Sequence, residues 1–177
     1  KVVSELNEDV RALPFVRGVM ARIKLRARDP AGAVDDAEVA FEANQNSKNL
    51  QVLVMAYDLS GQTDKSYELL KTYSANNSND LSALMLFAEK EIGKDKTSAI
   101  AKYQEALELN QDNFVVLNNL AYLLMEENKL SEASAFAKRA YDLKPNNAAT
   151  VDTYAQILVR QNRNKEALDA YNRVMND

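Results

Sequence analysis

Apolar and small residues recur along this chain with the period of an α-helix. In the segment that begins at Phe114, four of them have the spacing i, i+3, i+4, i+7, which places them on one helix face. Three alanines further along the same segment have the spacing i, i+4, i+7, which is one face of a second helix. The pattern predicts two successive amphipathic helices with these inward positions: Leu117, Leu120, Ala121, Leu124, Ala133, Ala137 and Ala140.

The same seven positions recur one period further along the chain, still small or apolar: Val151, Tyr154, Ala155, Leu158, Ala167, Tyr171 and Val174. Counting backwards in steps of 33 or 34 gives three further sets of first-helix positions, beginning at Leu84, Leu50 and Val16. The first inward position of each second helix follows the same steps and is always small: Ala33, Ser66, Ala99, Ala133 and Ala167. Self-similarity at a fixed period indicates a repeat architecture, here of five helix pairs.

Helix breakers are scarce, with three prolines and four glycines in 177 residues, and no hairpin turn separates alternating runs. The sequence therefore predicts an all-α fold. Asp29 followed by Pro30 indicates a helix N-terminus. Thr63, Ser131 and Asn164 stand where other second helices should be capped.

Composition restricts the chemistry. The chain contains no cysteine, histidine or tryptophan, which excludes thiolate and imidazole metal sites and the Ser/His/Asp and Cys/His/Asp types of catalysis. Its four glycines lie far apart, so no glycine-rich loop can hold a phosphate. We therefore expect no enzyme activity and no cofactor. The net charge of -4 and the lack of a long apolar run argue against nucleic acid and against membrane contact by this segment.

At these residues the chain resembles the tetratricopeptide repeat, a helix–turn–helix unit whose length matches the period found above. The stretch 114–147 matches its pattern best and ends in "YDLKPNN", with Pro145 in the turn. The missing tryptophan, Glu91 at an aromatic position and a turn one residue short near Gly93 depart from the pattern. The resemblance implies a right-handed α-solenoid of antiparallel helix pairs, a superhelix whose first helices line a concave groove.

The register divides the chain into five units, at residues 13–46, 47–80, 81–113, 114–147 and 148–177. Residues 1–12 are expected to be part of a preceding repeat or a capping helix. Lys1 is not an initiator Met, and Asp177 ends inside a helical pattern. We therefore expect a fragment of a longer chain.

The resemblance also implies which first-helix positions face the groove. A soft apolar patch of Met55, Met85, Tyr122 and Met125 is suited to a peptide, or else packs between neighbouring helices. Arg17, Lys24 and Arg28 share a stripe that would hold a carboxylate, or else form a solvated helix face offset by local acids such as Asp29, Asp35 and Asp36. The candidate groove residues are Arg17, Lys24, Met55, Met85, Glu89, Asn118, Asn119, Tyr122, Met125, Asp152 and Gln156.

The function that the resemblance implies is a non-catalytic scaffold that binds a protein or peptide in this groove. The alternatives are a structural spacer of a longer repeat protein, or the repeat part of an envelope exopolysaccharide or secretion system protein. Bacterial tetratricopeptide lipoproteins have similar sequence patterns, and this resemblance favours the envelope or periplasm over the cytoplasm. Because the last helix pair has no covering helix, we also expect weak self-association through the C-terminal end.

Overall fold

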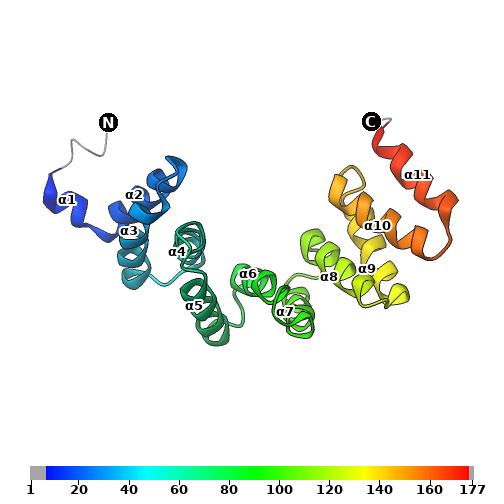
Figure 1. Cartoon of the computed structure of the whole chain (residues 1–177), viewed down its shortest axis with the longest axis horizontal. Coiled ribbons are helices and arrows are strands. Elements are labelled where there is room, and N and C mark those ends of the chain that lie inside the picture. Colours follow the sequence, from blue (N-terminus) through cyan, green and yellow to red (C-terminus); the bar gives the residue numbers. More distant parts are fainter. Residues whose placement is uncertain (1–6, 176–177) are drawn as a thin grey trace. The chain divides into compact units, whose positions relative to one another are not determined.

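The computed structural model describes residues 7–175, which are helical except for turns and short connections (Figure 1). The helices are α1 (Glu8–Ala12), α2 (Pro14–Arg26), α3 (Pro30–Ala43), α4 (Ser47–Leu59), α5 (Thr63–Asn76), α6 (Leu81–Glu91), α7 (Lys96–Leu109), α8 (Phe114–Glu126), α9 (Leu130–Leu143), α10 (Ala148–Arg160) and α11 (Asn164–Met175). The described residues contain no strand, and the all-α prediction is confirmed. None of the described helices is long and apolar enough to span a membrane.

The chain divides into two compact units, Lys1–Ala83 and Leu84–Asp177, with the division inside α6. In the first unit, α2 packs on α3 and α4, and α4 packs on α5. Small side chains permit the close approach of these helices, because Ala21, Ala33 and Ala37 are almost completely buried between them. Residues 1–12 were expected to belong to a preceding repeat or a capping helix. Of these residues, 8–12 form the short helix α1, which contacts α2, and residues 1–6 lie outside the described residues.

The second unit contains α7 to α11, with α8 packed on α9 and α10 packed on α11. In its core, leucines of the first helix of each pair pack against alanines of the second helix. Leu117, Leu120, Ala133 and Ala137 have no exposed surface. Tyr141 and Tyr154 stack with their ring centroids 5.2 Å apart and so fill the space between α9 and α10. The repeated pattern thus places most predicted inward positions of this unit in one core. The prediction is wrong for Tyr171, which is 39% exposed because no further helix covers α11 in the described residues.

Four of the five turns from first to second helix close by a shared backbone arrangement, the exception being the turn from α6 to α7. Arg28, Gly61, Asn128 and Asn162 all adopt positive φ, between 58° and 80°. The residue after each of them donates its backbone N–H to a carbonyl five residues earlier, as in Lys129 to Leu124 at 2.9 Å. Only glycine adopts this conformation without cost, so three of the four turns carry a small strain.

Side chains cap the N-terminal ends of several helices. Asp29 caps α3 as predicted, because its carboxylate accepts the N–H of Gly32 at 2.9 Å. The predicted caps at Thr63, Ser131 and Asn164 are wrong: α5 and α11 begin at Thr63 and Asn164, and Ser131 lies inside α9. Each of the helices α5 and α9 begins directly after the backbone turn that ends the helix before it. Their N-cap residues make no side-chain hydrogen bond.

Candidate functional site

A buried carboxylate lies between α2 and α3 in the first unit. Asp36 has no exposed surface, and two cations of α2 reach it, Arg17 Nε at 2.8 Å and Lys24 Nζ at 2.6 Å. Lys24 also donates to the carbonyl oxygen of Gly32 at 2.8 Å. Arg17 also pairs with Asp35. These contacts neutralise a charge that would be costly to bury alone.

This arrangement differs from the stripe of three cations expected in the groove. Arg17 and Lys24 bind a carboxylate of the chain itself, and Arg28 lies in the turn after α2. Of the two alternatives that the sequence left open, the pairing of Arg17 and Lys24 with Asp35 and Asp36 agrees with a face whose charge is offset by local acids.

A shallow cleft of about 300 Å³ lies between α2 and α4. Leu25 and Val52 form part of its apolar lining, and Met55 lies beside them with 52% of its surface exposed. The polar part of the lining consists of two arginines and one glutamine. The residues that line this cleft are Arg22, Leu25, Arg26, Gln51, Val52 and Met55.

In the second unit the predicted apolar patch is only partly accessible. Tyr122 is 45% exposed on α8. Met85 on α6 is half-buried, and its sulfur lies 3.7 Å from the side-chain nitrogen of Asn113. Met125 is fully buried, so it belongs to the core and not to an accessible groove surface. For Met125 the packing alternative therefore holds.

Asn119 joins α8 to α7. Its side-chain nitrogen donates to the hydroxyl of the fully buried Tyr103 at 3.0 Å, so the asparagine is a structural contact between helices. Burial raises the pKa of Tyr103 to about 12, the bond from Asn119 lowers it, and the carboxylate of Glu89 adds to the increase. Loss of hydration raises the pKa of Glu89 itself, against the charge of Lys90. The side-chain oxygen of Asn118 is buried, and it accepts no hydrogen bond within the described residues.

The remaining candidates lie on α10. Asp152 is exposed and accepts hydrogen bonds from Gln156 Nε2 at 2.6 Å and from the hydroxyl of Tyr171 at 2.9 Å. Asp152 and Tyr171 also belong to a cleft of about 540 Å³ on α10 and α11, whose lining residues are Ala148, Ala149, Val151, Asp152, Tyr171 and Val174.

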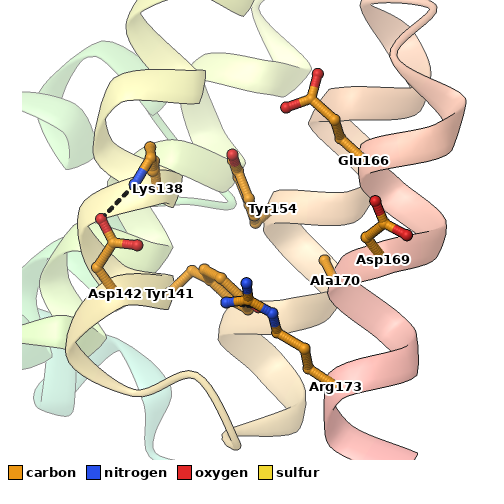
Figure 2. A pocket seen from close by; sticks show the side chains of 8 residues that line it. All are labelled: Lys138, Tyr141, Asp142, Tyr154, Glu166, Asp169, Ala170 and Arg173. Carbon is orange, nitrogen blue, oxygen red and sulfur yellow. Dashed lines mark hydrogen bonds and ion pairs between the residues drawn. The ribbon is translucent and has the colours of Figure 1, made fainter.

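Sequence reasoning missed a further pocket of about 260 Å³ among α9, α10 and α11 (Figure 2). Three of its charged residues form ion pairs: Lys138 pairs with Asp142 at 2.6 Å, and Glu166 pairs at 2.7 Å with Arg163, which lies outside the lining. The i, i+4 spacing of Lys138 and Asp142 is visible in the sequence, but the convergence of three helices is not. The lining residues are Lys138, Tyr141, Asp142, Tyr154, Glu166, Asp169, Ala170 and Arg173.

The described residues contain no group of three or more His, Cys, Asp or Glu side chains that could hold a metal ion. Their accessible clefts instead combine apolar floors with hydrogen-bonding and charged edges. Such surfaces are suited to recognise a chain segment through side-chain burial and polar contacts.

Comparisons with known proteins agree with the repeat. The tetratricopeptide repeat family model matches residues 102–133, which span most of α7, all of α8 and the start of α9. No curated protein matches the chain.

Solved structures show a similar fold. A crystal structure of MamA protein has a TM-score of 0.75 at 17% identity, and the alignment covers 94% of this chain and 91% of that one. MamA from Desulfovibrio magneticus RS-1, residues 41 to the end, has a TM-score of 0.77 at 14% identity, covering 92% of this chain and 93% of that one. MamA AMB-1 has a TM-score of 0.71 at 21% identity, covering 89% and 95% respectively. Residues 102–133 thus match the tetratricopeptide repeat family, and these solved structures show that the chain shares their fold of repeated helix pairs.

Proposed function

We propose that this chain is a non-catalytic scaffold that binds a protein or peptide on the surfaces of its first helices. The observation that carries the proposal is the exposure of large apolar side chains there, since Met55 is 52% and Tyr122 is 45% exposed. Neither side chain is needed to close the core. Exposed apolar groups beside polar ones are typical of recognition surfaces.

The test is binding to a displayed library of random peptides, followed by calorimetric titration of the selected sequences. Met55→Glu should abolish binding to the first unit, and Tyr122→Ala should weaken binding to the second. The matched controls are Leu109→Glu and Leu143→Ala, which alter leucines of similar exposure at the ends of second helices. Each variant is first checked for unchanged helix content by circular dichroism.

The proposal fails if no peptide saturates the wild-type chain, or if the control variants reduce binding as strongly as the first-helix variants. Measurable turnover of a substrate by this chain would contradict its non-catalytic part. The concave groove and the envelope location that the resemblance implies are hypotheses. So is the alternative that the chain is a structural spacer, which predicts that it binds no peptide at all.

A further inference from the structure

The cleft between α2 and α4 carries two cations that have no partner among the described residues. Arg22 and Arg26 are both exposed, and in this part of the chain neither guanidinium makes an ion pair or a hydrogen bond. They are four residues apart on α2, so they lie on one face, where like charges repel. The neighbouring cations Arg17 and Lys24 are instead engaged with Asp36.

Arg22 is exposed at a position that is covered in other first helices, where α6 also carries a cation, the half-buried Lys90. Ala56 occupies the equivalent place in α4, one repeat later, and is fully buried, as is Leu123 in α8 at 1% exposure. A guanidinium at this place would lose its hydration under an apolar helix without gaining a partner. The face is therefore suited to water or to an anionic group.

The floor of the same cleft is apolar. Leu25 and Val52 are half-buried there, and Met55 is more than half exposed beside them. A methionine side chain adapts its shape to an apolar group placed against it. The cleft of about 300 Å³ admits a side chain of moderate size, and Gln51 offers an amide to a neighbouring peptide group.

We infer that this cleft binds an acidic peptide segment in which Asp or Glu residues flank one apolar side chain. The apolar side chain lies against Val52 and Met55, and the carboxylates pair with Arg22 and Arg26. Arginine binds a carboxylate through two parallel N–H groups, which gives orientation as well as attraction. The inference rests on the proposed function, because it names the partner class of the first-helix surface in this unit.

The test uses the full chain and a fluorescein-labelled peptide, Asp-Glu-Leu-Glu-Asp, in fluorescence anisotropy titrations at two salt concentrations. The double variant Arg22→Gln/Arg26→Gln should weaken binding about tenfold, as expected for loss of charge-assisted hydrogen bonds. Lys71→Gln/Lys165→Gln is the matched control, since it removes the same charge from exposed positions on α5 and α11 and should leave binding unchanged.

The apolar contact is tested by a double-mutant cycle, in which one substitution is made in the protein and the other in the peptide. Replacing the peptide's leucine by glycine should weaken binding to the wild-type chain but have little further effect on Met55→Ser, because the two side chains contact each other. Equal binding of the glycine peptide to the wild-type chain would mean general charge attraction and would overturn the inference.

The inference also fails if the acidic peptide does not bind, if both double variants lose affinity equally, or if an anionic polysaccharide such as polygalacturonate competes more strongly than the peptide. Binding of the neutral peptide Ser-Ser-Leu-Ser-Ser in preference to the acidic one, with loss in Met55→Glu, would overturn the acidic partner but leave the scaffold proposal intact. Loss of all peptide binding, including that of library sequences, would overturn both.

Discussion

Met125 and Val159 occupy the same position of two successive first helices, yet Met125 is fully buried and Val159 is 52% exposed. The difference arises from packing, since α10 lies against α8 while the far side of α10 is uncovered in the described structure. One repeat position can thus be core or surface according to its neighbour.

This difference predicts unequal costs of truncation. Met125→Ala should lower the free energy of unfolding by about 2–5 kcal/mol, because it leaves a cavity in a closed core. Val159→Ala should lower it by less than about 1 kcal/mol, because water already reaches that side chain. Urea denaturation of the two variants measures both, and equal costs would contradict the packing difference.

The uncovered side of the last helix pair predicts weak self-association. Val159, Leu168 and Tyr171 together expose an apolar surface on α10 and α11. Sedimentation velocity over a wide concentration range should show a rising average mass, which Leu168→Glu reduces. Leu109→Glu is the control at a comparable exposed leucine on α7. A strictly monomeric wild-type chain at the highest concentration would contradict the prediction.

The buried carboxylate of Asp36 predicts a marked loss of stability when its charge is removed. Asp36→Asn leaves Arg17 and Lys24 without their shared partner, and we expect a loss of about 1–3 kcal/mol because both cations retain some hydration. Asp35→Asn is the matched control. Its carboxylate is 80% exposed, so the same change should cost less than about 0.5 kcal/mol in denaturation.

Tyr103 predicts a dependence of stability on alkaline pH. Because burial raises its pKa to about 12, the folded state keeps the hydroxyl proton that the unfolded chain loses near pH 10. Stability from this group is therefore fully present below pH 10 and is lost as the pH rises toward 12.

The measurement is urea denaturation at several pH values from 8 to 11.5. Tyr57, Tyr73 and Tyr171 also have raised pKa values, so the pH dependence of the wild-type chain is the sum of several tyrosines. Tyr103→Phe should therefore reduce the slope of the free energy of unfolding against pH without removing it. An identical slope in the variant would show that Tyr103 ionises equally in both states.

The turns predict opposite effects of glycine at equivalent places. Gly61→Ala places a Cβ at φ 80° and should lower the free energy of unfolding by about 1 kcal/mol. Arg28→Gly relieves a positive φ of 62° and should raise it by about 0.5 kcal/mol, after the entropy cost of glycine. Thermal and chemical denaturation check both signs, and a destabilised Arg28→Gly would show that the side chain contributes more than its strain costs.

The fold could be predicted from the sequence because it follows from the spacing of small and apolar residues, which is local and repeated. The expected core positions Leu117, Leu120 and Ala121 are all fully buried. The starts of second helices were harder to predict, since the backbone arrangement after Asn128 replaces a side-chain cap and leaves no simple residue signal.

The accessible surface was less predictable than the core. The sequence placed Met55, Tyr122 and Met125 together by position, but whether each is covered depends on the next helix. The sequence also left open whether Arg17 and Lys24 face a ligand or local acids, because the acid that contacts both of them lies on a different helix. Helical spacing puts Arg22 and Arg26 on a separate stripe, but their association with the methionine of α4 required the packing of α2 on α4.

The contact of Asp36 with two cations also fixes how α2 and α3 are aligned along their axes. Alanines such as Ala33, Ala37 and Ala40 have much the same shape, so a shift of α3 by one helical turn would replace one alanine contact with another. The same shift of about 5.4 Å would separate Asp36 from both Arg17 and Lys24 and leave a charge buried alone. Charge thus selects one alignment among several that the small side chains alone would permit.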